Sequence, residues 1–322
     1  MKTSKILVTG GAGFIGSHLC EKLLDQGHTV IAFDMSDGLK IEHLWGHERF
    51  QFVRDSILNE EILEEQFKDI DIVFHFAAVA DPKRYVMDPL GTLEVDLKGT
   101  LNLLKVASRC GVKVMFASTS EIYGKNPNVP WSETSERVLG STHIHRWCYA
   151  TAKAAGEHYC YAYYEQKKMP FVIFRFFNVY GPRLDDLGSG RVIPMFLKQF
   201  LENKPLYIHD QGKQTRTFVY VDDVIEAITK LAFTPKAEGQ VFNIGSTEET
   251  SILKLADLMR RIGHFQSEFV FVPYKDAFGP GFEDIPRRVP DVRKIYDAIG
   301  WKSTTPLEVG LQKTLEYYSQ YK

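Results

Sequence analysis

The segment KILVTGGAGFIG, residues 5–16, decides the fold of this chain. Residues 5–9 form a short apolar run that ends at glycines, which is typical of a buried strand in a parallel sheet. Residues 14–26 then place apolar side chains at helical spacing. The glycines permit a tight turn and a close approach to a pyrophosphate, whose charge the first N–H groups of the helix attract. The segment predicts a dinucleotide site with contacts from Gly10, Gly13, Phe14, Ile15 and Gly16.

Strand and helix patterns continue to alternate through the first half of the chain. This rhythm predicts an α/β fold of the Rossmann type, in which a doubly wound parallel sheet binds ligands beyond the carboxyl ends of its strands. Further strands are expected at Thr29–Asp34, Phe50–Arg54, Ile70–Phe76, Val112–Ser118 and Phe171–Phe177, and long helices at Pro89–Cys110 and Tyr149–Lys167.

The pattern loosens after residue 177. We expect residues 1–177 to form the dinucleotide-binding Rossmann domain. Residues 178–322 are expected to form a smaller C-terminal α/β domain for the substrate, interleaved with the first. Two loops are expected in this second part, at Gly181–Arg191 and Pro273–Pro290, because glycine, proline and charged residues are frequent there.

The composition excludes several classes of protein. The chain carries 39 Lys and Arg against 41 Asp and Glu, so no basic excess indicates a nucleic-acid partner or a membrane surface. No apolar run approaches the roughly 20 residues of a membrane helix, and the N-terminal run reaches glycines too soon for a signal peptide. The four cysteines are scattered without a CxxC pair. We therefore expect a cytoplasmic protein with reduced thiols and no metal.

Two aspartates at strand ends indicate which dinucleotide binds. Asp34 ends the second expected strand, where a carboxylate accepts hydrogen bonds from the adenine ribose and repels a 2′-phosphate, which favours NAD over NADP. The alternative is a strand-end cap. Asp55 follows the third strand and is expected to bind the adenine amino group, although it can equally be the N-cap of a helix at Ile57–Leu63.

Tyr149 and Lys153 lie four residues apart at the start of an expected helix, so they share one face. A tyrosine normally ionises near pH ~10, and both a neighbouring ammonium and a cationic nicotinamide ring favour the phenolate. Such a tyrosine can take a hydroxyl proton while hydride leaves the same carbon. Thr119, at the end of the fifth strand, is expected to hydrogen-bond the same oxygen.

Several further segments accompany these residues: HFAA at 75–78, STSEIYG at 118–124, RFFNVYGPR at 175–183 and GKQTRTF at 212–218. With them the chain resembles the extended short-chain dehydrogenase/reductases, specifically the NAD-dependent epimerase/dehydratase group, over nearly its whole length. The resemblance implies NAD that is reduced and reoxidised within one cycle, with Ala77 among its contacts. It also implies that Asn178 and Arg216 bind a nucleotide diphosphate, which suits an amide and a guanidinium. Many family members have Asn where this chain has Asp96.

A 4-keto sugar can be reduced on its other face, can lose its C6 hydroxyl, or can lose carbon dioxide if C6 is a carboxylate. Glu121 follows Thr119 by two residues and is expected on the same side, near C5, as a base or a water-orienting group. Ser120 occupies the position of the acidic aspartate of typical 4,6-dehydratases, and serine is a poor acid. The order Thr119-Ser120-Glu121 resembles that of UDP-glucuronate decarboxylases.

Other local matches resemble the bifunctional decarboxylases and UDP-apiose/xylose synthases: RW at 146–147, GPRLD at 181–185 and Arg288 within RRVPD. Arg288 matches the arginine that these enzymes place near the sugar carboxylate; the alternative is an ion pair with Asp284 or Asp291. Tyr85 is also expected to contact the substrate. The candidate cations for a carboxylate are Arg84, Arg183, Arg191 and Arg288.

The resulting hypothesis is an NAD-dependent enzyme that decarboxylates a UDP-uronic acid such as UDP-glucuronate through a 4-keto intermediate. The alternatives are a 4-epimerase of a UDP-sugar or UDP-uronate, then a dehydratase, and, in a different class, a non-enzymatic NAD-sensing regulator. The intact Tyr149/Lys153 pair argues against the regulator. A homodimer is expected through the helices Pro89–Cys110 and Tyr149–Lys167, which form a four-helix interface in this family.

Overall fold

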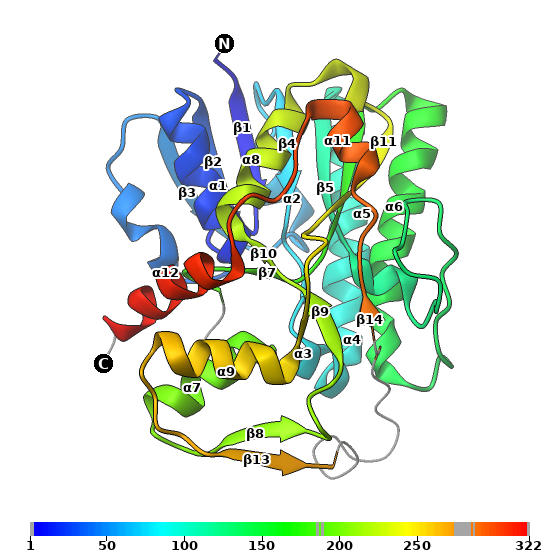
Figure 1. The fold of residues 1–322 in the computed structure, drawn as a ribbon. Coiled ribbons are helices and arrows are strands. Elements are labelled where there is room, and N and C mark those ends of the chain that lie inside the picture. Colours follow the sequence, from blue (N-terminus) through cyan, green and yellow to red (C-terminus); the bar gives the residue numbers. More distant parts are fainter. Residues whose placement is uncertain (1–2, 185–186, 188–189, 274–284, 286, 321–322) are drawn as a thin grey trace.

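A computed structural model describes residues 3–184, 187, 190–273, 285 and 287–320 of the chain. Its centre is a seven-stranded sheet with the order β11-β6-β5-β4-β1-β2-β3 (Figure 1). Every neighbouring pair is parallel. The strands are β1 (Lys5–Thr9), β2 (Thr29–Asp34), β3 (Phe50–Arg54), β4 (Ile72–His75), β5 (Lys113–Thr119), β6 (Phe171–Phe176) and β11 (Gln240–Ile244).

Successive residues of each strand face opposite layers of helices, as the doubly wound fold requires. Ile6 and Val8 of β1 belong to one core, which α1 (Phe14–Asp25) and α8 (Val221–Ala232) cover. Leu7 belongs to the other core, covered by α2 (Glu60–Glu65), α5 (Thr100–Cys110) and α6 (Cys148–Lys167). Apolar side chains buried on both faces explain why the strands read as continuous hydrophobic runs. The predicted Rossmann fold is confirmed.

The predicted strands agree closely with the observed ones. β1, β2 and β3 have the predicted bounds, whereas β4 is shorter than Ile70–Phe76. The seventh strand, β11, was not predicted in this sheet, because it comes from the second half of the chain and pairs with β6. Strand β11 and helix α8, which come after residue 177 in the chain, pack on elements that precede this residue. The division of the chain into two domains at residue 177 stays a prediction.

Two predicted helices differ in the structure. The single helix Pro89–Cys110 is interrupted, because α4 (Pro89–Leu93) and α5 flank a π-helical turn, η2, at Glu94–Gly99. A helix beginning at Ile57 with Asp55 as its N-cap is wrong. Helix α2 begins at Glu60, and Asn59 caps it by accepting a hydrogen bond from the Ile62 N–H.

A second group of elements lies beyond the carboxyl ends of the sheet (Figure 1). Its helices α7 and α9 pack with a parallel pair of strands, β8 and β13. A three-stranded sheet, β12-β9-β14, connects this lobe with the main sheet. In the described residues no helix is both long and apolar enough to span a membrane. The helices and strands outside the central sheet that have not yet been given bounds are α3 (Pro82–Met87), β7 (Val179–Tyr180), α7 (Val192–Leu201), β8 (Leu206–His209), β9 (Thr215–Thr217), β10 (Val219–Tyr220), β12 (Glu249–Ser251), α9 (Ile252–Ile262), β13 (Phe269–Val272), β14 (Arg287–Arg288), α11 (Arg293–Ile299) and α12 (Leu307–Ser319). Of these, α11 packs against β11 of the main sheet.

The two loops expected in the second part of the chain fall partly outside the described residues. Residues 274–284 and 286 account for most of the predicted loop Pro273–Pro290, so the alternative pairing of Arg288 with Asp284 lies outside the description. What the structure describes of this segment includes β14, which pairs in parallel with β9 and places Arg288 beside Arg216.

Candidate active site

The glycine turn after β1 leaves no room for side chains. Gly10 has a φ of +72°, and a Cβ built on it would lie 2.7 Å from the Ala77 nitrogen. A Cβ on Gly16 would lie 2.1 Å from the Gly10 oxygen. Gly13 donates its N–H to Gly10 at 3.0 Å and precedes α1, so the N–H groups of Phe14 and Ile15 open the helix. This cradle fits a dinucleotide pyrophosphate, as predicted from the sequence.

Of the aspartates predicted for the adenosine end, Asp34 is the last residue of β2 and Asp55 directly follows β3. Asp34 Oδ2 accepts the Ala12 N–H at 3.1 Å, and Oδ1 accepts the Ser36 N–H at 2.9 Å. The carboxylate of Asp34 therefore lies against the glycine turn. Asp55 Oδ1 accepts the Ser56 N–H at 2.7 Å, and its own N–H donates to Asp34. These contacts leave Asp55 next to Asp34 at one edge of the turn.

Tyr149 and Lys153 are both buried on the first turns of α6. The Lys153 ammonium lies 6.0 Å from the centroid of the Tyr149 ring. Burial and the charge of Asp96 raise the pKa of Tyr149, and Arg191 is a cation whose charge lowers it. Burial also lowers the pKa of Lys153, against the opposing charge of Asp96. The protein by itself keeps the phenol of Tyr149 protonated, so ionisation of this group requires additional positive charge, such as that of a nicotinamide ring.

Strand β5 delivers Thr119 to the same region, where the chain turns. Thr119 Oγ1 accepts the Glu121 N–H at 3.2 Å and so begins the 3-10 turn η3, Ser120–Tyr123. The sequence analysis expected Thr119 and Glu121 on the same side because side chains alternate along a strand. The strand ends at Thr119, so this alternation does not determine where the two side chains point. The turn determines their directions instead. Ser120 is buried within it.

Glu121 lies between two buried arginines that come from distant parts of the chain. Arg288 Nη1 lies 2.5 Å from Glu121 Oε1, and Arg146 Nη2 lies 2.7 Å from Glu121 Oε2. Burial raises the pKa of Glu121, but the charges of both arginines outweigh this effect and lower the pKa to about 2. Glu121 is therefore ionised at neutral pH. The alternative pairing of Arg288 with Asp291 is wrong, because Asp291 pairs with Arg293.

Tyr85 connects this arginine cluster with Tyr149. Its ring stacks on the Tyr149 ring, with centroids 5.3 Å apart and planes inclined by 5°. The Tyr85 hydroxyl accepts a hydrogen bond from Arg146 Nη1 at 2.8 Å. The structure thus brings together Tyr149, Tyr85, Glu121 and Arg288, four of the residues selected from the sequence.

Comparison with known proteins agrees with this geometry. Residues 6–245 match the model of the NAD dependent epimerase/dehydratase family. The chain belongs to this family. Its members depend on NAD, so this family member is an NAD-dependent enzyme, and the glycine cradle is where its residues fit the cofactor.

Individual relatives cover almost the whole of this family member. A UDP-N-acetyl-alpha-D-glucosaminuronate decarboxylase from Bacillus cytotoxicus is 38% identical over 98% of each chain. UDP-glucuronic acid decarboxylase 1 from Danio rerio is 36% identical over 98% of this chain and 73% of its own. The solved structure of a UDP-glucuronic acid 4-epimerase from Bacillus cereus, in complex with UDP-glucuronic acid and NAD, superposes with a TM-score of 0.88 at 33% identity. That match covers 99% of this chain and 100% of the epimerase.

The predicted diphosphate residues of this family member lie on and beside β9. Asn178 donates its side-chain N–H to the Thr217 carbonyl at 2.8 Å. Arg216 donates to the Thr215 carbonyl at 2.8 Å. Arg288 of β14 lies opposite Arg216 of β9 in the backbone register of the two parallel strands. The predicted diphosphate and carboxylate sites therefore lie on neighbouring strands.

The remaining candidate cations have different surroundings. Arg191 Nη2 donates to the Ala80 carbonyl at 3.0 Å, and its charge acts on both Tyr85 and Tyr149. Arg84 is exposed. Arg183 is held by α1, where its Nη1 and Nη2 lie 2.9 and 2.7 Å from the Glu21 carboxylate. The structure therefore groups Arg191 and Arg288 with the tyrosines, and gives Arg183 a partner elsewhere.

Arg146 is the site residue that the sequence analysis missed. It was noted only as part of a resemblance, and the structure places it, buried, against both Glu121 and Tyr85. A signal was present, since an arginine three residues before Tyr149 at the start of a helix lies on the same face.

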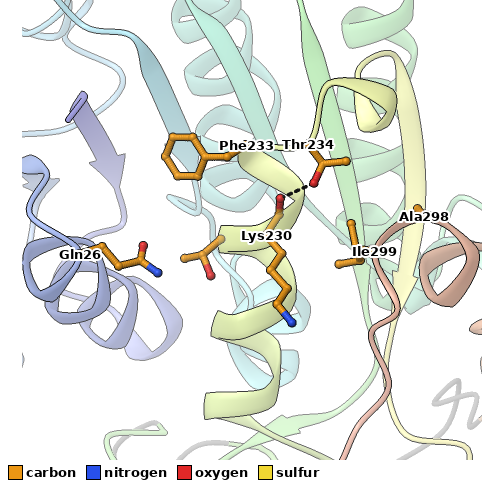
Figure 2. A pocket seen from close by; sticks show the side chains of 7 residues that line it. Gln26, Lys230, Phe233, Thr234, Ala298 and Ile299 are labelled. Carbon is orange, nitrogen blue, oxygen red and sulfur yellow. Dashed lines mark hydrogen bonds between the residues drawn. The ribbon is translucent and has the colours of Figure 1, made fainter. Parts of the chain in front are cut away.

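The family member also has a cavity of about 350 Å³ away from this site. Figure 2 shows it between the end of α1, α8 and α11, where Thr234 donates a hydrogen bond to the Lys230 carbonyl. Gln26, at the C-terminal end of α1, lines it, and the glycine turn lies at the opposite end of that helix. None of the predicted site residues lines this cavity.

Proposed function

We propose that this enzyme decarboxylates a UDP-linked uronic acid after oxidation of its C4 hydroxyl. The observation that carries the proposal is the buried cluster of Arg146, Glu121 and Arg288. Two cations and one carboxylate leave the cluster with an excess positive charge. In addition, the buried Nε of Arg288 has no hydrogen-bond partner among the described residues. A C6 carboxylate supplies the negative charge and the acceptor atoms that this cluster lacks.

The residues around Tyr149 suit oxidation and reduction at C4. NAD, when bound, supplies hydride acceptance and return at this carbon. Tyr149 takes the proton of the C4 hydroxyl, and Thr119 hydrogen-bonds the same oxygen. The pair formed by Lys153 and Tyr149 on one face of α6 keeps the base beside its cation. In the final reduction Tyr149 returns its proton to the C4 oxygen.

The chemistry between these two steps needs little from the protein. The C4 ketone is β to the C6 carboxylate, so the C5–C6 bond breaks and its electron pair enters a C4–C5 enolate. Carbon dioxide leaves, and C5 then takes a proton from solvent, so the net reaction consumes one proton in addition to the one that Tyr149 takes and returns. This step requires the C6 carboxylate to be positioned but requires no base at C5.

The ionisation of Glu121 favours decarboxylation over dehydration. Loss of the C6 hydroxyl begins with removal of the C5 proton by a base. Burial raises the pKa of Glu121, but the charges of Arg146 and Arg288 lower it to about 2, which makes Glu121 a poor base. We therefore assign Glu121 the role of holding the two arginines in place for the substrate carboxylate, in preference to removing the C5 proton.

Asn178, Arg216 and Arg191 complete the proposed substrate site. Arg216 lies on the strand next to Arg288, so a diphosphate at Arg216 leaves the sugar between that strand and Tyr149. Tyr85 forms one wall through its stacking on Tyr149. The relatives named for UDP-N-acetylglucosaminuronate and UDP-glucuronate support UDP as the nucleotide.

A 4-epimerase of a UDP-uronate is the second candidate. The observation in its favour is the close superposition on the UDP-glucuronic acid 4-epimerase from Bacillus cereus. An epimerase also needs a positioned C6 carboxylate, but its sugar must rotate before reduction. The two reactions differ in whether the C5–C6 bond breaks, and the product mass separates them.

The deciding experiment is mass spectrometry of products after incubation with NAD and a panel of substrates. The panel contains UDP-glucuronate, UDP-N-acetylglucosaminuronate, UDP-glucose and UDP-N-acetylglucosamine. Loss of the mass of carbon dioxide from one or both uronates is the expected result. An unchanged mass with a new sugar isomer by NMR identifies the epimerase and overturns the decarboxylase.

We also propose that the enzyme works as a homodimer in the cytoplasm. Helices α5 and α6 lie side by side at one edge of the molecule (Figure 1), and Tyr159 and Tyr164 on α6 are exposed. All four cysteines are free thiols, which suits a reducing compartment. Sedimentation velocity at micromolar concentration tests the dimer, which a monomer would contradict. Fractionation of expressing cells tests the compartment.

A further inference from the structure

A buried carboxylate lies behind Tyr149 and Lys153, in a position that the proposed mechanism does not use. Asp96 belongs to the π-helical turn η2, which packs against α6. It is 1% exposed, and Lys153 is 2% exposed. An unpaired buried charge is costly, so each of these residues needs a partner.

The hydrogen bonds of Asp96 are only half complete. Its Oδ1 accepts the Val79 N–H at 2.8 Å, in the segment that follows Ala77 beside the glycine turn. Its Oδ2 is buried and has no hydrogen-bond partner in the part of the chain that the structure describes. One carboxylate oxygen therefore anchors the segment that follows Ala77, and the other is buried without a hydrogen bond to offset its charge.

Lys153 has the complementary deficiency. Its ammonium faces two aromatic rings, with 5.1 Å to the Phe116 centroid and 6.0 Å to the Tyr149 centroid. Among the described residues no hydrogen bond or ion pair satisfies it. Asp96 and Lys153 carry opposite charges, so Lys153 lowers the pKa of Asp96 and Asp96 raises the pKa of Lys153, each against the effect of burial.

Among the titratable side chains that face Asp96 and Lys153, Asp96 is the group whose charge changes near neutral pH. Burial raises the pKa of Asp96 to about 6, although Lys153 and the Val79 N–H oppose this. The other titratable groups that face Asp96 and Lys153 are Tyr149, Cys148 and Cys160 on α6, where burial raises all three pKa values, and His75 at the end of β4, where burial lowers the pKa to about 3.

We propose that Asp96 is the counter-ion of Lys153 and a positioning residue for the active site. The proton of its carboxyl group links the binding of the cofactor to the ionisation of Tyr149. When Asp96 is ionised, its charge opposes ionisation of Tyr149. The charge of Asp96 acts on Tyr149, so the positive nicotinamide ring that the mechanism requires beside Tyr149 favours the ionised form of Asp96, and binding of NAD in its oxidised form releases the Asp96 proton. The part that concerns Tyr149 rests on its proposed role as the base.

Calorimetry of NAD binding tests the proton linkage without any sugar substrate. Binding heats are measured at pH 6 in buffers of different ionisation enthalpy, which gives the number of protons released. Wild-type protein is expected to release about half a proton per cofactor, because Asp96 is close to half-protonated there. Asp96→Asn retains the acceptor for the Val79 N–H and is expected to release none. Tyr149→Phe is expected to release as much as wild type.

A matched control variant and a second measurement distinguish the effect of Asp96 from an unspecific effect of substituting an aspartate. Asp88→Asn changes an exposed aspartate that caps α4, a position that asparagine also caps, and should release protons like wild type. Carbon-13 NMR of aspartate carboxyls in wild-type protein needs no variant to fold. It should show one carboxyl with a midpoint near pH 6 that moves lower when NAD is added. Equal proton release by wild type and Asp96→Asn, or no such carboxyl, overturns the proposal.

Turnover then separates this inference from the proposed function. Asp96→Asn removes a negative charge near Tyr149, so the acid limb of the pH profile of kcat should move to lower pH. A merely structural Asp96 would change kcat without moving the limb. If no sugar on the panel turns over but Asp96→Asn still loses proton release, the proposed substrate is wrong and the linkage stands.

Discussion

Arg288 Nη1 lies 2.5 Å from Glu121 Oε1, although 167 residues separate the two in the chain. The contact joins the turn after β5 with β14, and β14 pairs with the strand that carries Arg216. One ion pair therefore joins the segments that carry the proposed carboxylate site and the proposed diphosphate site. In the proposed binding mode, a sugar nucleotide anchored at Arg216 presents its C6 group where the two buried arginines meet Glu121.

Arg288→Gln is expected to impair turnover of the uronate selectively. It removes one cation from the carboxylate site and leaves Glu121 with Arg146 alone. Loss of a charge-assisted hydrogen bond costs about 1.5–3 kcal/mol, which corresponds to a decrease of about 10- to 150-fold in kcat/KM. Steady-state kinetics with the uronate that reacts in the panel measure it.

The neighbouring arginine supplies the control for this variant. Arg287→Gln removes an exposed side chain whose partner is Glu249 on β12, and should leave kcat/KM within about two-fold of wild type. Affinity for NAD should be unchanged in both variants. Equal losses in Arg287→Gln and Arg288→Gln would show that β14 matters only for folding.

Tyr149→Phe is expected to abolish sugar turnover while NAD still binds. The substitution removes the hydroxyl but keeps a ring that can stack on Tyr85. Removal of a general base typically costs about 10²- to 10⁴-fold. Product formation by mass spectrometry and NAD affinity by calorimetry are the two measurements. Retained turnover would assign the base to another residue, and a joint loss of NAD binding would point to a binding role.

The sequence predicted the residues whose positions follow from the strands. Asp34 and Thr119 end parallel strands, and such ends meet at one edge of the sheet, so their place in the site followed from the strand pattern. The partners of Glu121 did not follow, because Arg146 precedes a helix and Arg288 lies on a two-residue strand far along the chain. Pairing between such segments depends on tertiary packing that local spacing does not encode.

The π-helical turn at Glu94–Gly99 was not predicted from the sequence for a similar reason. The apolar pattern of Pro89–Cys110 is helical throughout, and a π turn shifts the register of a helix without changing its composition. A Cβ on Gly99 would lie 2.4 Å from Ile57 Cδ1, so the close approach at this turn depends on a tertiary neighbour. The inward direction of Asp96 follows from the turn and could not be read from periodicity.

Asp34→Ser is expected to weaken selection of NAD against NADP. The Asp34 carboxylate lies against the glycine turn through the Ala12 N–H, where it opposes a 2′-phosphate. Serine keeps a polar acceptor but removes the charge, so the ratio of the two dissociation constants should shift toward NADP by at least about ten-fold, or about 1.4 kcal/mol. Calorimetric titration with each cofactor measures it. Asp37→Ser, at an exposed position of the same loop, should leave the ratio unchanged.

His75→Gln is expected to remove a pH dependence of stability at the end of β4. His75 lies between the Thr9 and Thr100 hydroxyls, at 2.7 and 3.0 Å, and burial lowers its pKa from 6.5 to about 3. The unfolded chain therefore binds a proton below pH 6.5 that the folded protein does not. This lowers the free energy of unfolding by about 1.4 kcal/mol for each pH unit below 6.5, until the folded pKa is reached.

Urea unfolding of wild type and His75→Gln between pH 7.5 and 5 tests whether the contribution of His75 to the free energy of unfolding falls as the pH is lowered. Wild type should be the more stable at pH 7.5, because glutamine cannot bridge both hydroxyls in the same geometry. The difference should shrink by about 2 kcal/mol at pH 5, since only wild type loses the contribution of a neutral imidazole. His158→Gln, an exposed histidine on α6, should follow the wild-type curve. A constant difference between wild type and His75→Gln would mean that His75 gains its proton at the same pH in the folded and the unfolded chain, which would contradict the lowered pKa.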